Sequence, residues 1–93
     1  MKNSLSDKFK NKFADVFELP KDVVLDEPRI FMLGNFELNL ENHCGIIEYG
    51  RELIRIRIYQ GQLVILGEEL IIKKLTKETV EINGQITNVE FKY

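Results

Sequence analysis

His43 and Cys44 are the two residues of this chain whose side chains could form a nucleophile or bind a metal. A cysteine beside a histidine can be activated as a thiolate, and both residue types are ligands of zinc. One histidine and one cysteine are fewer ligands than either a catalytic or a structural zinc site requires. Adjacent side chains on an extended loop also tend to diverge. We therefore predict a polar turn, in which Asn42 and Gly45 take unusual backbone angles.

The carboxylates of the chain are scattered rather than gathered in one motif. Acid–base chemistry needs carboxylates that converge in a pocket, and positions on strand ends and outward faces do not predict such a pocket. No glycine-rich phosphate-binding string of the GxGxxG or GxxxxGK[ST] type occurs in the sequence. We therefore expect no enzyme activity, no catalytic residue, no cofactor and no metal site.

Arg55, Arg57 and Tyr59 form a candidate surface patch. The two arginines project from the same face of a predicted strand with the tyrosine beyond them, and basic side chains beside an aromatic ring can hold single-stranded nucleic acid. Glu48 and Glu52 are expected to pair with these arginines across strands. The net charge is −2, which provides no long-range attraction for nucleic acid. We expect no nucleic-acid partner.

The composition is that of one folded domain. The 93 residues are 44% hydrophobic and 30% charged, which is typical of a globular protein. A single cysteine excludes an internal disulfide, and no apolar secretion-signal segment follows the first lysines. An apolar run such as Leu63–Leu66 is far too short to span a membrane. We expect a cytoplasmic protein, and a peripheral association with a membrane stays open.

The segment Leu5–Leu19 is predicted to form an amphipathic helix. Its apolar residues recur at helical spacing, and lysines and aspartates occupy the other positions. Pro20 ends the helix because the residue before a proline is pushed out of the α region. The face that carries Phe9, Phe13 and Phe17 is the candidate interaction face. It could dock on the rest of the chain, on a membrane surface or on a partner protein.

The rest of the chain is predicted to consist of short strands, most of them separated by glycines. Asn83-Gly84 is the strongest hairpin signal, and Tyr59–Gln62 is a second turn. Leu63–Leu66 and Leu70–Ile72 are continuously apolar and are predicted to be buried on both faces or covered by the helix. Pro28 suggests an edge or a bend before the strand that follows it. The predicted strands are Val23–Leu25, Arg29–Leu33, Asn35–Leu40, Gly45–Tyr49, Glu52–Tyr59, Gln62–Leu66, Glu69–Leu75, Glu78–Ile82 and Gln85–Tyr93.

Together these elements predict a mostly β protein with a helical arm, residues 1–20, and a β-domain, residues 21–93. The short and even intervals between strand starts favour a small antiparallel β-sandwich or roll with an N-terminal amphipathic helix. A short β-solenoid stays the alternative, because runs punctuated by glycine can also stack in that way.

The ordered pattern of apolar and glycine positions resembles a known family. It runs through Pro28–Tyr49, Glu52–Leu75 and Glu81–Phe91. This pattern is similar to that of the YabP/YqfC family of sporulation proteins. The similarity is greater to the YqfC branch, because the lead-in Lys8–Leu25 also fits that branch. The pattern is specific for the family but contains no catalytic motif.

The resemblance implies a protein made in the mother cell during endospore formation, where family members act alongside membrane proteins. For the YqfC branch, the implied partner is a membrane protein of the YqfD type. The leading hypothesis is therefore a non-enzymatic interaction or adaptor module that binds such a partner. The alternative is a self-assembling structural β-protein of the developing spore, which leaves a homo-oligomer open.

Overall fold

The structure is a computed structural model that describes residues 27–93. These residues form one antiparallel sheet with the strand order β1-β2-β6-β5-β4-β3. The prediction of a mostly β, antiparallel domain is confirmed, and this pairing differs from the parallel stacking of a β-solenoid. The predicted helix and the predicted strand Val23–Leu25 lie outside the described residues. The strands are β1 (Arg29–Leu33), β2 (Glu37–Glu41), β3 (Gly45–Tyr49), β4 (Leu53–Ile58), β5 (Gly61–Leu75) and β6 (Thr79–Lys92).

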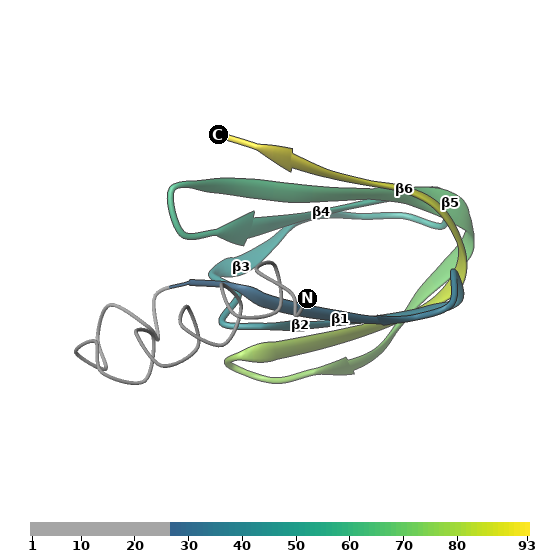
Figure 1. Ribbon diagram of the computed structural model, residues 1–93, viewed down its shortest axis with the longest axis horizontal. Helices are drawn as coiled ribbons and strands as arrows, with labels where there is room; N and C mark the ends of the chain where they lie inside the picture. The colour runs from purple at the N-terminus through teal and green to yellow at the C-terminus, as the bar shows by residue number, and fades with distance from the viewer. Residues whose placement is uncertain (1–26) are drawn as a thin grey trace, which may run out of the picture.

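The sheet bends over on itself, so that it forms two layers (Figure 1). The two long strands β5 and β6 run through both layers and curve together between them. One layer contains β3, β4, the first part of β5 and the second part of β6. The other contains β1, β2, the first part of β6 and the second part of β5. One continuous ladder of backbone hydrogen bonds therefore serves both layers.

Gly67 and Gly84 lie where β5 and β6 bend. The pairing of β5 with β6 shifts register after Leu66 and again before Ile71, which marks bulges in the bend. A Cβ atom at Gly67 would overlap the carbonyl oxygen of Gln85, and one at Gly84 would also collide with backbone. Both positions therefore require glycine because the two strands approach closely there.

The Leu70 side chain occupies the space that these two glycines leave. Its Cδ2 atom lies 3.0 Å from the Cβ position of Gly67 and 3.0 Å from that of Gly84. The leucine is 1% exposed and belongs to the core, whereas the next residue, Ile71, is 50% exposed. The bend is therefore packed around one apolar side chain.

The core lies between the two layers and is made of aliphatic side chains. The alternation predicted for β4 is confirmed, because Ile54, Ile56 and Ile58 are buried while Arg57 is exposed. Burying such a side chain contributes roughly 1.5–3 kcal/mol relative to leaving it in water. The cluster contains Leu38, Leu40, Ile54, Ile56, Ile58, Leu63, Ile65, Leu70, Val80, Ile82 and Ile86.

Two predictions about strand breaks are wrong. Asn83-Gly84 is not a hairpin turn, because the chain passes through it inside β6, and Asn83 pairs with strands on both sides. Gly67 likewise lies inside β5 instead of separating two strands. The two-sided burial predicted for Leu63–Leu66 holds from Leu63 to Ile65, but that of Leu70–Ile72 fails at the exposed Ile71.

Candidate interaction surfaces

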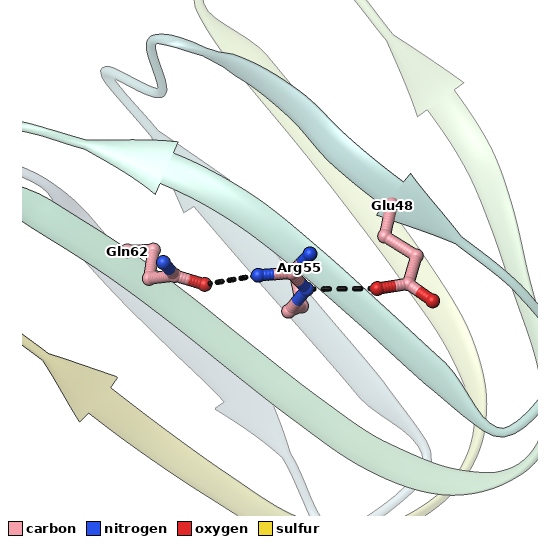
Figure 2. Close-up of polar contacts among 3 residues, drawn as sticks. All are labelled: Glu48, Arg55 and Gln62. Carbon is pink, nitrogen blue, oxygen red and sulfur yellow. Dashed lines mark hydrogen bonds and ion pairs between the residues drawn. The ribbon is translucent and has the colours of Figure 1, made fainter.

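Arg55 of the predicted patch is held by two neighbours on the outer face of the sheet (Figure 2). Its Nε donates a hydrogen bond of 2.8 Å to Oε1 of Glu48 on β3, and its Nη1 donates one of 3.0 Å to Oε1 of Gln62 on β5. The predicted cross-strand pair of Glu48 with this arginine is thus present. The guanidinium is compensated by a carboxylate, so its charge contributes little to a basic surface.

Arg57 and Tyr59 complete the patch without such partners. Arg57 is exposed on β4, and Tyr59 is exposed in the turn between β4 and β5. Among residues 27–93, no ion pair involves Arg57 or the predicted partner Glu52. Within the described residues the patch therefore offers one guanidinium without an ion-pair partner, that of Arg57, and one exposed aromatic ring, that of Tyr59. Neutralising several phosphates takes several cations, so this geometry favours a small polar contact over a nucleic-acid groove.

The loop that contains His43 is joined to a distant turn by hydrogen bonds of the histidine ring. Asn42 and Gly45 have φ angles of 68° and 129°, as the predicted polar turn requires. The His43 ring accepts a hydrogen bond of 3.0 Å from the Gly45 amide at Nδ1, so Nε2 carries the proton and donates to the Thr76 carbonyl over 2.8 Å. The ring therefore joins the β2–β3 loop to the β5–β6 turn. Both nitrogens are used by backbone groups, and neither faces the exposed Cys44 as a base would.

Replacing His43 by alanine is expected to lower the free energy of unfolding by about 1–2 kcal/mol, because two partly exposed hydrogen bonds are lost. Urea denaturation of the variant measures this change. The matched control is Cys44→Ala, an exposed neighbour that should change the stability by less than about 0.5 kcal/mol. Equal free energies of unfolding for the two variants would contradict a stabilising role of the His43 hydrogen bonds.

An open depression of about 310 Å³ lies where the β3–β4 turn meets the bend of β5. Its lining residues are Tyr49, Gly50, Arg51, Leu70 and Ile71. The Tyr49 hydroxyl accepts a hydrogen bond of 3.0 Å from the Ile72 amide, and the Leu70 amide donates one of 2.8 Å to the Arg51 carbonyl. These bonds fasten the turn onto the bend. The depression therefore marks the line along which two hydrogen-bonded backbone segments meet, the β3–β4 turn and the bend of β5.

Large apolar side chains stay exposed on β1 and on the turn after it. Phe31, Met32, Leu33 and Phe36 are each exposed. Phe31 and Leu33 share the outer face of β1 and form the β1 surface, whereas Met32 lies on the opposite face of the strand. The Arg29 guanidinium lies 5.9 Å from the centre of the Phe31 ring and 3.6 Å from a carboxylate oxygen of Glu41. Sequence reasoning found the strand but missed this surface. The signal was the uninterrupted apolar run of a strand that follows Pro28.

A second apolar surface lies at the end of β6. The rings of Phe91 and Tyr93 are stacked with 6.1 Å between their centres and 9° between their planes, and both are exposed. Tyr93 also lies against Gly61, where a Cβ atom would contact its ring. Strand β2 pairs with β6 only from Thr79 to Asn83, so among residues 27–93 the part of β6 that carries Phe91 has a strand neighbour on one side only.

The candidate face of Phe9, Phe13 and Phe17 lies outside the described residues. Within residues 27–93, no helix is long and apolar enough to cross a membrane. In the same part of the chain, no group of three metal-binding side chains comes together.

Comparison with known proteins identifies relatives over most of the chain. Residues 25–93 match the model of the YabP family. A protein named "Uncharacterized protein YqfC", from Bacillus subtilis (strain 168), is 35% identical over 74 residues, which cover 80% of this chain and 80% of that protein. No solved structure matches the chain.

Proposed function

The chain belongs to the YabP/YqfC family of sporulation-related proteins, and on this premise we propose that it is a non-enzymatic adaptor that binds a membrane protein during sporulation. It acts in the cytoplasm of the mother cell, at the membrane surface. Its partner is a membrane protein of the YqfD type. The apolar N-terminal face makes the principal contact, and the β-domain supplies a folded body with further exposed apolar surfaces that contact the partner.

The observation that carries this proposal is the exposure of large apolar side chains on two separate parts of the β-domain. Phe31 and Leu33 on β1 and Phe91 near the end of β6 are about half exposed, and Tyr93 is more so. Scattered apolar residues are normal on protein surfaces, but a stacked aromatic pair and an apolar strand are grouped. Such groups mark surfaces that contact other molecules.

The N-terminal face has the composition that a docking helix needs. Phe9, Phe13 and Phe17 recur at helical spacing, and lysines flank them in the sequence. An amphipathic helix of this kind can lay its apolar side into a groove of a partner protein. We therefore assign the principal contact with the membrane protein to this face.

Recovery of a specific membrane protein with the tagged full chain, from the membrane fraction of sporulating cells, tests the proposal. We expect the variant Phe9→Asp/Phe13→Asp to recover at least about ten-fold less of the membrane protein than the unchanged chain does, because carboxylates on the apolar face oppose its burial. Deletion of residues 1–19 should have the same effect. Quantitative mass spectrometry of the bound fraction measures the loss.

The matched control is Asn3→Asp/Asn11→Asp, which adds the same two negative charges outside the apolar set. This variant should recover the membrane protein as well as the unchanged chain does. The circular dichroism of all variants shows whether the β-domain is folded. Undiminished recovery by Phe9→Asp/Phe13→Asp would remove the N-terminal face from the proposal, and failure of the unchanged chain to recover any membrane protein would remove the adaptor role.

A further inference from the structure

Strand β1 has the sequence of a central strand but the position of an edge strand. Its residues Ile30–Leu33 are all apolar, a pattern that is typical of strands covered on both faces. In the described part of the chain, β1 pairs with β2 alone and its other side has no strand neighbour. Phe31 is 53% exposed and Leu33 is 58% exposed. An apolar edge of this kind is a template for pairing with another strand.

The other described edges carry features that oppose such pairing. Strand β3 contains a bulge between Ile46 and Glu48, and its Glu48 carboxylate is paired with an arginine. The end of β5 carries Lys73 and Lys74, and the end of β6 carries Glu90 and Lys92. Charges and bulges are the usual protection of sheet edges. Among the edges in residues 27–93, β1 alone has neither a bulge nor a charge within its run from Ile30 to Leu33.

We propose that β1 pairs antiparallel with β1 of a second copy of this chain. Complete overlap of Arg29–Leu33 with itself places Phe31 opposite Phe31 on a two-fold axis. Ile30 then lies opposite Met32 of the second copy, and Arg29 lies opposite Leu33 of the second copy. The two sheets become one continuous sheet across the axis. Since the same strand is used by both copies, the contact closes and yields a dimer, not a fibre.

The charges on the outer face suit this self-pairing. Arg29 is the only charged residue of β1, and the antiparallel register separates it from Arg29 of the second copy. Leu33 pairs with Glu37 on β2, so the row that contains Arg29 runs from its own Glu41 to Glu37 of the second copy. Arg29 thus has its own Glu41 on one side and the uncharged Leu33 of the second copy on the other, and no like charges are opposed. A second copy provides this arrangement on both sides of the axis, because the two-fold symmetry repeats the row.

Cysteine cross-linking tests the register in the full chain with Cys44 replaced by serine. In the proposed dimer, the Cα atoms of residue 31 in the two copies lie about 5 Å apart, within the reach of a disulfide. Residue 33 and its counterpart are separated by four residues along the strands, or about 14 Å, beyond that reach. We expect Phe31→Cys to form a covalent dimer on mild oxidation, and the equally exposed Leu33→Cys to form at least about ten-fold less. Equal cross-linking at both positions, or none at either, would overturn the proposal.

A charge exchange tests the same axis without oxidation. Phe31→Lys places two lysines opposite each other and Phe31→Glu places two glutamates, so each variant alone should dimerise at least about ten-fold more weakly. A mixture of the two variants should recover the dimer, because lysine then faces glutamate. Light scattering measures the fall from twice 10.9 kDa to 10.9 kDa and its recovery. Ile71→Lys, at a half-exposed position on β5, should leave dimerisation unchanged.

A monomeric wild-type chain at high micromolar concentration, or a mixture that does not recover the dimer, would overturn the pairing. The N-terminal segment or a partner strand would then be the occupant of this edge. The inference does not depend on the adaptor role, because the dimer is measured with the purified chain alone. Recovery of a membrane protein and formation of the dimer can therefore succeed or fail separately.

Discussion

Replacing Gly67 by alanine should lower the free energy of unfolding by about 3 kcal/mol. The added methyl group would overlap the carbonyl oxygen of Gln85, and it would also lie 3.0 Å from the Leu70 side chain. The first of these atoms belongs to the backbone of β6, so the collision can be relieved only by moving one strand away from the other. For a domain of this size the expected decrease in melting temperature is roughly 12–24 °C. Differential scanning calorimetry measures it directly.

Gly50→Ala is the matched control for this substitution. Gly50 lies in the β3–β4 turn, where a Cβ atom would be 3.4 Å from the Leu53 carbonyl oxygen, which is an ordinary contact. Alanine also restricts the unfolded chain, so the control should range from no change to a gain of about 1 kcal/mol. A melting temperature of Gly67→Ala as high as that of the control would contradict the close approach of the strands.

Replacing Leu70 by alanine should lower the free energy of unfolding by about 3–4 kcal/mol. The side chain is almost completely buried and fills the bend between the two glycines, so its removal leaves a cavity as well as losing apolar burial. Denaturation in urea gives the change, and the neighbouring Ile71→Ala is the control. Since Ile71 is half exposed on the outer side, its truncation should cost less than about 1 kcal/mol.

The double variant Gly67→Ala/Leu70→Ala distinguishes the two causes of instability. Removal of the leucine side chain relieves only the contact of 3.0 Å and leaves the overlap with the Gln85 carbonyl oxygen. We therefore expect the double variant to be less stable than either single variant. A double variant as stable as Leu70→Ala alone would show that the side chain, not the backbone, makes Gly67 necessary.

Local alternation was enough to predict most strands, but not the way in which the sheet folds over. Arg29–Leu33 and Gly45–Tyr49 are found with the predicted bounds, because each is a short run that ends at turn residues. Gly67 and Gly84 were interpreted as breaks, since a glycine inside an alternating run usually marks a turn. Their actual role depends on contacts between β5 and β6 that only the folded register creates. The local pattern shows where the glycines are but not which strand lies against them.

The candidate surfaces likewise combine contacts that the local sequence could predict with contacts that it could not. The pairing of Glu48 with Arg55 could be predicted, because both lie on the outward faces of successive strands. The second partner of the arginine, Gln62, depends on the register of β4 with β5 and was not predicted. The exposure of Phe31 and Leu33 was missed for a related reason. An apolar run does not reveal whether its strand lies in the middle or at the edge of a sheet.

The passage of β5 and β6 through both layers determines how this protein can open. Neither layer can lose its long strands without breaking the ladder of the other, so we expect the described domain to unfold as a single cooperative unit. A sandwich of two separate sheets can shear at the interface between them, whereas here the backbone itself joins the layers. The edge at β1 and the edge at β3 therefore belong to one hydrogen-bonded sheet and enclose one core. A partner that binds either edge in the folded state alone thereby stabilises the whole unit, including the edge that it does not touch.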